Sequence, residues 1–520
     1  MFSRIQKWMI QYPVGFVFLL YVLSVCIRLH ILDRPMGGHH EWLTAHALMT
    51  LEIWEKAGAQ TYHFLPVYTY PNPADLHIKM WNMGAISDSA GNWYYISYPG
   101  FAFILPSVLF SVFQIPVTPL HLQLFNLLTH FPATLLLFLI IRNAISNRNQ
   151  EIQVYSALVG SAMYLFSHVS LWYYSNVYFC DTLVQTLWLL SFWLWLRYQK
   201  QATTGNAVFF WLSLVLTCYT EWLGLFFAAI AGIYPLFESK FKKGWDFFVL
   251  SLTASGFALF FFFWHYSQIN GWEALQTGLL EKFLSRSAIE NPENQMGFFA
   301  RKSWVYLIHY YRTLYLPVII LWIFCSGMAF VLLKERLLSI LYASEKQILL
   351  LSFLPVLIHH SVFFNFTVVH DFSILKTAVP FCISSAIFLI ILAEKLQETN
   401  QNEKVRWLLG FNLIVCMIGV VQYSNVNGKA NFDYTFQTLG ERIRSECSTS
   451  DLIALRTVGF EPYQGVEFPQ INFYAKRNVF LYNDEAEVQN HLRKFGLKKA
   501  ILYGIRPDCS VVFRKELLRN

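Results

Sequence analysis

The chain of 520 residues is too apolar for an ordinary soluble protein of its length. Hydrophobic residues make up 55% of it, aromatic residues 18% and charged residues only 14%, which excludes disordered and fibrous proteins and indicates a membrane protein. Residues 1–426 hold 46 charged residues and residues 427–520 hold 25, so we expect a membrane body followed by a short polar tail. The net charge of +7 is modest, and because Lys and Arg mostly flank apolar stretches, we expect no nucleic-acid partner.

Twelve apolar stretches are candidates for membrane-spanning helices, most of them long enough for the ~20 residues that a crossing needs. The first follows Arg4 and Lys7 and has no small-residue cleavage site after it, so we expect an anchor with a cytoplasmic N-terminus rather than a cleaved signal peptide. In chain order the stretches lie at residues 8–32, 100–117, 120–141, 152–171, 178–196, 207–219, 221–237, 247–267, 311–333, 347–369, 374–393 and 407–424.

Basic residues concentrate in five connections, which the positive-inside rule places in the cytoplasm: 142–150, 197–205, 238–245, 334–346 and 394–406. Residues 33–98 are then external, so residues 100–141 must cross an odd number of times, although Pro116 and Pro119 split them into two segments. We expect one of these two segments to be interfacial or re-entrant. That leaves eleven crossings and an external tail.

Two long external loops contain predicted helices. In the first loop, residues 33–98, apolar residues recur at helical spacing from Leu43 to Trp54, which predicts an amphipathic helix over 41–56 lying on the membrane surface. The second loop, residues 268–306, mixes apolar and basic residues and predicts an amphipathic interfacial helix.

The tail, residues 427–520, is predicted to form a small external α/β domain. We expect helices at 434–446 and 485–495 and strands at 451–457, 471–482 and 498–505. Its two cysteines, Cys447 and Cys509, could pair if the tail faces an oxidising compartment.

The first external loop opens with ionisable residues beside the membrane, in the order Gly37-Gly38-His39-His40-Glu41-Trp42. Glu41 is a candidate catalytic carboxylate because two histidines and two flexible glycines precede it. Alternatively, it stabilises the start of the following helix through the helix dipole. His39, His40 and Glu41 also offer good ligands for a divalent metal, but they match no recognised metal-binding spacing.

Two acidic residues stand at the external ends of apolar stretches. An ionisable group such as Asp181 is costly there unless it faces a water-filled cavity or a partner, which makes it a functional candidate. Its alternative role is an N-terminal cap. Glu221 is similar, although turns between two closely spaced helices commonly carry a charge.

A third external position carries His370, Asp371 and Lys376, where one membrane helix ends and the next begins. We expect Lys376 to reach outward, where it and His370 would form an anion site at a helix N-terminus. Alternatively, Lys376 is a snorkelling anchor. Tyr98 belongs to an aromatic group, residues 93–98, that fits either an interfacial belt or a wall on which a sugar stacks.

The order of these features resembles the GT-C superfamily of integral-membrane glycosyltransferases, in the branch with protein O-mannosyltransferases and the lipid A aminoarabinose transferase. The matching features span nearly the whole chain, but each motif is short. Near the start they are an acidic residue in the first external loop, Glu41, and a Tyr-Pro segment that opens the next helix, Tyr98-Pro99. Further along they are an Asp at the outer end of a helix, Asp181, and a His-Asp-aromatic segment followed by Pro, His370-Asp371-Phe372 with Pro380. The last is a strand with an Arg-containing turn in the tail, Asn472–Tyr482.

The resemblance implies transfer of a sugar from a polyprenyl phosphate to a glycan, lipid or protein acceptor at the external face of the plasma or inner membrane. The family mechanism is a single inverting displacement, in which Glu41 would remove the acceptor's proton and Asp181 would orient acceptor or sugar. Lys376 and His370 would hold the phosphate. The chain departs from the family in having His40-Glu41 where an Asp or an acidic pair is common, so His39 or His40 could share the role of base. It also has Pro99-Gly100 where Pro-Pro is common.

Three other functions fit parts of the sequence. A transporter or lipid flippase would line a path near the membrane midplane with its polar residues, whereas here they gather at external helix ends. An O-antigen-type ligase or polymerase would use a large loop between late helices. A non-catalytic scaffold would result if the departure at His40-Glu41 reflects a lost base. No nucleotide-binding glycine motif is present, which agrees with a lipid-linked donor, and no cofactor beyond the optional divalent metal is expected.

Overall fold

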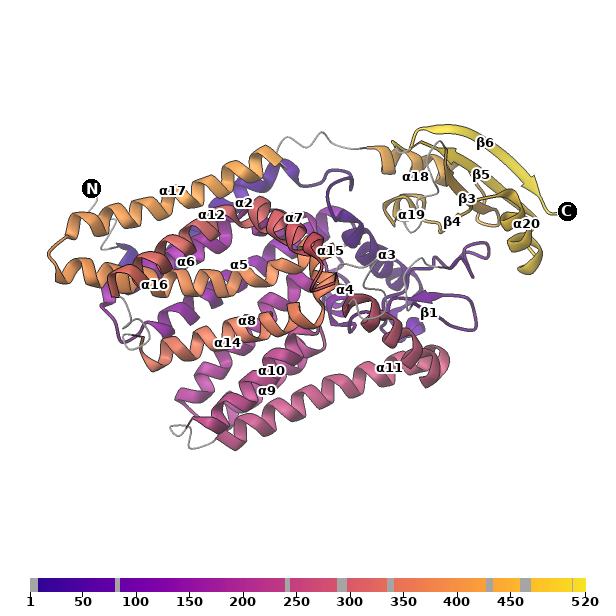
Figure 1. The fold of residues 1–520 in the computed structure, drawn as a ribbon. Helices are drawn as coiled ribbons and strands as arrows, with labels where there is room; N and C mark the ends of the chain where they lie inside the picture. The colour runs from indigo at the N-terminus through magenta and orange to yellow at the C-terminus, as the bar shows by residue number, and fades with distance from the viewer. Residues whose placement is uncertain are drawn as a thin grey trace.

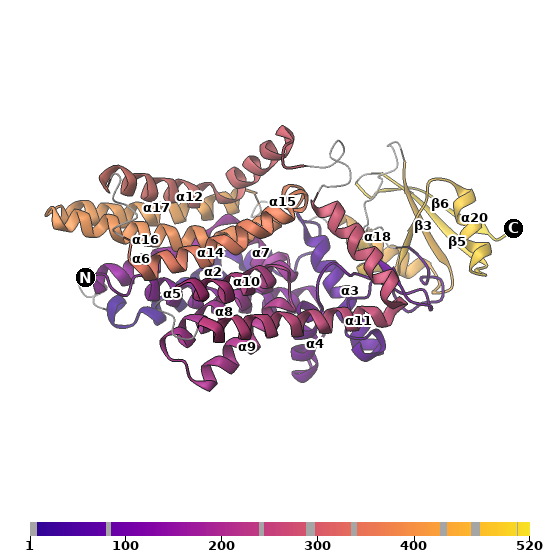
Figure 2. The same cartoon turned by 60° about the horizontal axis from the view of Figure 1, so that its bottom comes forward.

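The computed structural model describes residues 8–79, 85–238, 244–287, 297–333, 341–426, 434–458, 469–506 and 508–520. Long helices run side by side in one body, and a small domain with a β-sheet, formed by the tail, lies at one end of it (Figures 1 and 2). The first loop, with helix α3 (Glu41–Ala57), lies between the body and the tail. The chain is thus an α-helical polytopic protein with a C-terminal α/β domain.

Each of the twelve apolar stretches contains a helix. The helices of the body are α2 (Pro13–Arg28), η1 (Leu29–Ile31), α4 (Phe101–Val112), α5 (Pro119–Ala144), α6 (Gln150–Phe166), α7 (His168–Asn176), α8 (Cys180–Lys200), α9 (Thr204–Cys218), α10 (Leu223–Phe237), α11 (Gly244–Ser287), α12 (Arg301–Leu333), α14 (Ala343–Val362), α15 (Phe364–Val369), η4 (Asp371–Thr377), α16 (Ala378–Glu398) and α17 (Asn402–Val426).

Among the described residues, five helical segments are long and apolar enough to cross a membrane, and a sixth is the pair α6 and α7, which bends by 56°. The five are Pro13–Ile31, Pro119–Ala144, Gly244–Ser287, Arg301–Met328 and Asp371–Glu398. Helix α4 has only 12 residues, and at 1.5 Å per residue it is too short for a hydrocarbon core of about 30 Å. Its length agrees with the expectation that residues 100–141 cross once.

The first loop forms α3, the 3₁₀ helix η2 (Ala59–Tyr62) and a short hairpin of β1 (Ile86–Ser87) and β2 (Trp93–Tyr94). The expected helix is present, but it is covered by protein and has no exposed face along most of its length. Nearly all of α3 is buried, including Glu41 and every residue from Leu43 to Trp54. The reason is that the tail covers α3, so its polar face meets protein instead of water.

The second loop contains a helix, as expected, and this helix is the second half of α11, separated from the first half by a kink. Helix α11 continues to Ser287 and is interrupted only at Asn270 and Gly271, where the backbone leaves the helical conformation. Gly271 has φ of 79°, a value that glycine adopts at no steric cost. The break lets the second half of α11 turn back toward α15 (Figures 1 and 2), where the side chain of Asn365 donates to the carbonyl of Ser285 at 2.6 Å.

In its described residues, the tail forms three helices and a four-stranded sheet. The helices are α18 (Thr435–Glu446), α19 (Pro469–Ala475) and α20 (Glu485–Lys494), and the strands β3 (Leu452–Thr457), β4 (Val479–Leu481), β5 (Lys499–Ile505) and β6 (Val511–Leu518). The strand order is β4-β3-β5-β6, with β3 parallel to both neighbours and β6 antiparallel to β5. Cys447 and Cys509 do not form a disulfide bond with each other.

The predicted strand over 471–482 is wrong in its first half, because residues 469–475 form α19 and only 479–481 form a strand. The alternation of Ile471, Phe473 and Ala475 fits a strand, but tertiary packing favours the helix. A Cβ atom on Gly440 of α18 would lie 3.0 Å from the carbonyl oxygen of Ile471 and 2.9 Å from the amide nitrogen of Ala475. Glycine at this position therefore lets α19 pack directly on α18.

Candidate active site

Two groups of ionisable side chains lie at the two ends of η4. Asp371, at the start of η4, contacts His39, His40 and Tyr173, and we call these four residues the imidazole cluster. Lys376, near the end of η4, contacts Asp181 and Glu221. His359 bonds to Glu221, and we call these four residues the buried ion cluster.

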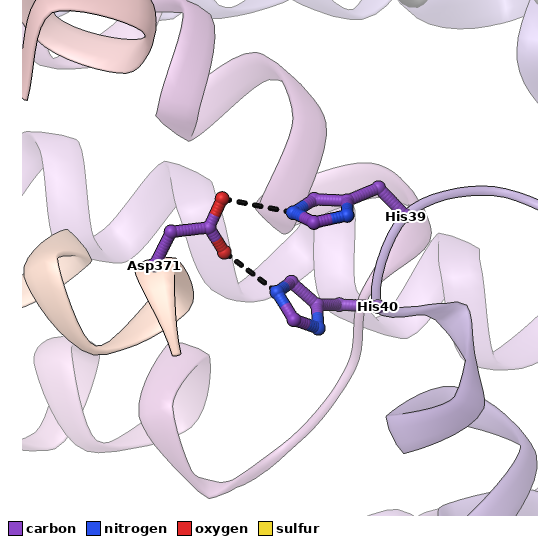
Figure 3. A group of neighbouring side chains, drawn as sticks. All are labelled: His39, His40 and Asp371. Atoms are coloured by element: carbon purple, nitrogen blue, oxygen red, sulfur yellow. Dashed lines mark hydrogen bonds and ion pairs between the residues drawn. The ribbon is translucent and has the colours of Figure 1, made fainter. Parts of the chain in front are cut away.

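In the imidazole cluster, the Asp371 carboxylate accepts three hydrogen bonds. Nε2 of His39 lies 2.8 Å from Oδ2, and Nε2 of His40 lies 2.6 Å from Oδ1 (Figure 3). The Tyr173 hydroxyl donates to Oδ1 at 2.8 Å. With three donors on it, Asp371 is a poor proton acceptor itself but orients both imidazoles.

The proton position on His40 follows from Trp42. The indole N–H can only donate, and it lies 3.1 Å from Nδ1 of His40, so Nδ1 must accept. The proton of neutral His40 is then on Nε2 and donates to Asp371. Burial lowers the pKa of His40, although Asp371 acts in the opposite direction. His40 also has φ of 60°, a left-handed conformation that costs energy for a non-glycine residue and is common at functional sites.

His39 differs from His40 in being open to solvent, with 57% of its side chain exposed. Its Nε2 donates to Asp371, which leaves the lone pair of Nδ1 available. Within the described part of the chain, no residue bonds to this nitrogen. The backbone of His39 is held by Trp172, whose indole N–H donates to its carbonyl at 3.1 Å. His39 therefore combines an exposed basic nitrogen with a carboxylate on its other side.

Glu41 lies apart from the imidazole cluster. Its side chain is 1% exposed and is paired with Arg34, and its Oε2 accepts the N–H of Gly38 at 2.6 Å. Burial raises the pKa of Glu41 to about 7, although Arg34 and the N–H groups of Gly38 and Gly37 act in the opposite direction. These contacts give Glu41 a role in shaping the turn that carries the two histidines.

The buried ion cluster corrects the expectation that Lys376 reaches outward. Lys376 is fully buried, its Nζ donates to Asp181, and it lies 3.9 Å from Oε1 of Glu221. His359 bonds to the same Glu221 oxygen at 3.0 Å. The reason is that η4 turns the side chain of Lys376 into the protein, where two carboxylates offset the cost of burying an ammonium group.

In the described structure, His370 forms no hydrogen bond or ion pair with Lys376. Its ring stacks on Phe372 instead, with centroids 5.1 Å apart. It lies on the side of the imidazole cluster, 6.4 Å from the His40 ring. Tyr98 is buried, so the expectation of an interfacial belt does not hold for it, and its ring supports Arg286.

Arg286 is a further cation near these residues. The sequence predicted only that it belongs to an amphipathic helix. It is 9% exposed, and its guanidinium lies 4.8 Å from the centroid of Tyr98 and 4.6 Å from that of Phe366. Among the described residues it has no carboxylate partner within ion-pair distance. Phe366 also packs against His370, 4.8 Å away, so Arg286 is linked to the imidazole cluster through the rings of Phe366 and His370. His359 and Tyr173 were missed as well, because nothing in their local sequence marks them.

The metal expectation needs a correction. The three side chains that gather within 4.8 Å are His39, His40 and Asp371, and Glu41 is absent because Arg34 and Gly38 engage it. The donor types suit a divalent ion. If Nε2 of His40 bound a metal, however, the proton of the neutral ring would have to be on Nδ1. That N–H would then point at the indole N–H of Trp42. The residues in this arrangement therefore do not fit a metal at Nε2 of His40.

No protein-family model and no curated protein matches the sequence. Solved structures do match. ArnT from Cupriavidus metallidurans bound to undecaprenyl phosphate is 11% identical, with a TM-score of 0.55 over 95% of this chain and 93% of that one. AglB, an archaeal oligosaccharyltransferase from Archaeoglobus fulgidus in complex with an inhibitory peptide and a dolichol-phosphate, is 10% identical, with a TM-score of 0.57 over 95% and 70%. An Archaeoglobus fulgidus oligosaccharyltransferase complex with Zn and sulfate is 11% identical, with a TM-score of 0.55 over 94% and 67%. The chain has the GT-C fold of these membrane proteins.

Proposed function

We propose that the protein is a membrane glycosyltransferase that moves a sugar from a polyprenyl phosphate to an acceptor at the external face of the plasma or inner membrane. The observation that carries the proposal is the exposed His39 bonded to Asp371, with the cation Arg286 linked to this site through the rings of Phe366 and His370. The fold agrees, since the similar ArnT and AglB structures hold undecaprenyl phosphate and dolichol-phosphate.

In this proposal His39 is the general base. Nδ1 of His39 takes the proton of the acceptor hydroxyl, and Asp371 stabilises the imidazolium that results. The acceptor oxygen then bonds to the anomeric carbon while the bond from that carbon to the phosphate oxygen breaks. The electron pair leaves with the polyprenyl phosphate, and the configuration inverts. General-base help of this kind is worth typically ~10²–10⁴-fold.

Arg286 would hold the leaving phosphate, because it is a buried guanidinium that is linked to the site through Phe366 and His370 and has no carboxylate partner among the described residues. Guanidinium groups bind phosphate in two-point geometry. Lys376 would add positive potential from its buried position, although Asp181 and Glu221 offset its charge. Charge stabilisation matters most here, since phosphate is already a good leaving group.

Asp181 and Tyr98 would orient the sugar or acceptor. Oδ2 of Asp181 and the hydroxyl of Tyr98 are buried and lack a hydrogen-bond partner within the described part of the chain. Buried polar atoms without a partner are costly, so a hydroxyl-rich substrate that bonded to them would gain affinity. Glu41 becomes a residue that positions the turn of His39 and His40, in place of the base that the family resemblance implies.

The rival transporter function has less support. Asp181 lies in the first turn of α8, Glu221 in the turn between α9 and α10, and Asp371 at the start of η4. These are ends of helices, whereas a transport path would place ionisable groups along helix centres near the midplane.

The test uses protein purified in nanodiscs, with its co-purified lipids identified by mass spectrometry. A polyprenyl-phosphate sugar on the wild-type protein supports the proposal, and its absence together with no binding of added polyprenyl phosphate overturns it. For the base, His39→Gln should lower transfer to an acceptor by about 10²-fold or more and keep donor lipid bound. His30→Gln, which changes an exposed histidine, is the matched control. Transfer by His39→Gln at the wild-type rate would remove His39 as the base.

A further inference from the structure

The tail contacts the first loop at several places, among them the stacked rings of His77 and Phe495. One contact is a short segment at the end of α19, residues 474–478, which we call the tail clamp. Arg477 contacts both carboxylate oxygens of Asp75, with its Nε 2.9 Å and 3.0 Å from them. Lys476 donates to Glu52 of α3 at 2.6 Å. Every one of these four side chains is at least partly buried, so the tail clamp is an internal interface rather than a surface contact.

The backbone of the tail clamp is adapted to this docking. Lys476 has φ of 54°, which is unfavourable for a residue with a side chain. The left-handed turn ends α19 and sends Lys476 and Arg477 to different parts of the first loop. Such strain persists where surrounding contacts hold it, and it is concentrated at functional sites.

One route from the tail clamp to the active site is direct. The hydroxyl oxygen of Tyr474 accepts the backbone N–H of Met36 at 2.9 Å. Met36 is 2% exposed and begins the turn Met36–His40. That turn has no free space, because a Cβ on Gly38 would lie 2.8 Å from both Arg34 and Trp172. A shift of Met36 would therefore move His39 and His40.

A second route runs through aromatic rings. Asn478 accepts the N–H of Tyr70 at 2.7 Å and donates to the carbonyl of Tyr68 at 2.8 Å. The Tyr68 ring stacks on His46 with centroids 4.1 Å apart and an interplanar angle of 15°. His46 packs edge-on against Trp42 at 5.8 Å.

The second route ends at His40, because Trp42 donates to Nδ1 of His40. The two routes thus meet at adjacent residues of the imidazole cluster. Tyr474 acts on the backbone that precedes His39, and Asn478 acts on the side chain that sets the proton of His40. Both start from one segment of the tail.

We propose that Tyr474 and Asn478 are positioning residues, and that docking of the tail clamp holds the Met36–His40 turn in its active geometry. The catalytic consequence rests on the proposed function, whereas the effect on the turn does not. The tail thus helps to hold the active-site turn in place. A substitution that weakens docking of the tail clamp lowers turnover although the substituted residue does not contact a substrate.

The first experiment measures amide hydrogen exchange in the full-length protein in nanodiscs. Tyr474→Phe removes the acceptor for the Met36 N–H and should make the peptide over residues 36–40 exchange about threefold faster or more, with an unchanged melting temperature. Tyr482→Phe is the matched control, because the hydroxyl of Tyr482 is buried in the same domain and has no partner among the described residues. Equal exchange of residues 36–40 in wild-type protein and Tyr474→Phe would overturn the proposal.

The second experiment uses Asn478→Leu, which removes both bonds to the first loop. We expect faster exchange in residues 36–46 and, with a competent donor and acceptor, a kcat lowered about tenfold at an unchanged KM for the donor. Asn478→Asp, which keeps the acceptor oxygen for Tyr70, should recover part of the loss. A fall in kcat with no local change in exchange would overturn the positioning role. Absence of transfer by the wild-type protein would count against the proposed function alone, since the exchange result stands independently.

Discussion

Trp42 donates its indole N–H to Nδ1 of His40 across 3.1 Å, and this bond decides which nitrogen of His40 carries a proton. The proton on Nε2 faces Asp371, 2.6 Å away. A metal ion at the same place would need the lone pair of Nε2 and would leave two N–H groups facing each other. Trp42 therefore favours a hydrogen-bonded cluster over a metal site.

We expect Trp42→Phe to raise the affinity of the protein for Zn²⁺ by about tenfold, since the opposing donor is worth about 1–3 kcal/mol when it loses its acceptor. Isothermal titration calorimetry with Zn²⁺ on the purified protein measures the change. Adding His40→Ala to Trp42→Phe should cancel the gain. Tight Zn²⁺ binding by the wild-type protein that Trp42→Phe does not strengthen would contradict the proton assignment.

Glu41 gives a prediction on pH. Its pKa is raised from the ordinary 4.5 to about 7 by burial, so the folded state binds the proton more tightly than the unfolded state. The resulting stabilisation is complete below about pH 4.5 and is lost as the pH rises through about 7. The melting temperature of the wild-type protein, measured relative to Glu41→Gln, should therefore fall between pH 5.5 and pH 8. A difference that stays constant or grows over this range would show that Glu41 is charged throughout.

Lys376 and Asp181 give a prediction on stability. Breaking a buried ion pair by removing one partner costs about 3–5 kcal/mol, so Lys376→Met should lower the melting temperature strongly by leaving Asp181 and Glu221 unneutralised. Adding Asp181→Asn should restore part of the loss, because one of the two uncompensated charges is removed. The control is Lys395→Met, which breaks an exposed pair with Glu398 and should change the stability by less than about 1 kcal/mol.

The arrangement of residues 100–141 can be tested at Thr118, the N-cap of α5. Because α4 is too short to cross the membrane, we expect Thr118 on the external side. Thr118→Cys in a Cys26→Ser background, which removes the exposed native thiol, should react with a membrane-impermeant maleimide applied to intact cells. Reaction only after the cells are opened would place Thr118 inside and contradict the arrangement.

The helices of the body were predictable because each depends on a local property, an apolar run long enough to form a helix. The errors have tertiary causes. Residues 471–475 have a pattern that suits strand or helix, and contact with Gly440 selects the helix. Helix α3 has the polar face of a surface helix, but the tail covers it and supplies Lys476 as a partner for Glu52.

The candidate site was predictable as a set of residues and not as a set of pairs. Its members stand out because ionisable groups are costly at the ends of membrane helices. Their partners lie far apart in the chain, however: His39 and Asp371 are separated by 332 positions and Lys376 and Asp181 by 195. No local pattern reveals such pairs, so the resemblance alone assigned the base to Glu41.

By itself, the sequence determined that this is an apolar helical body with a polar tail, and it predicted that the ionisable residues of the candidate site stand at helix ends. Composition and hydrophobic run length suffice for that, since burial of apolar surface does not depend on which residues meet. Only the tertiary structure decided that Arg34 forms an ion pair with Glu41 and that both histidines bond to the Asp371 carboxylate. It also decided that the Tyr474 hydroxyl accepts the N–H of Met36. Hydrogen bonds and ion pairs depend on distance and direction within a few tenths of an ångström, and packing of the whole chain sets these.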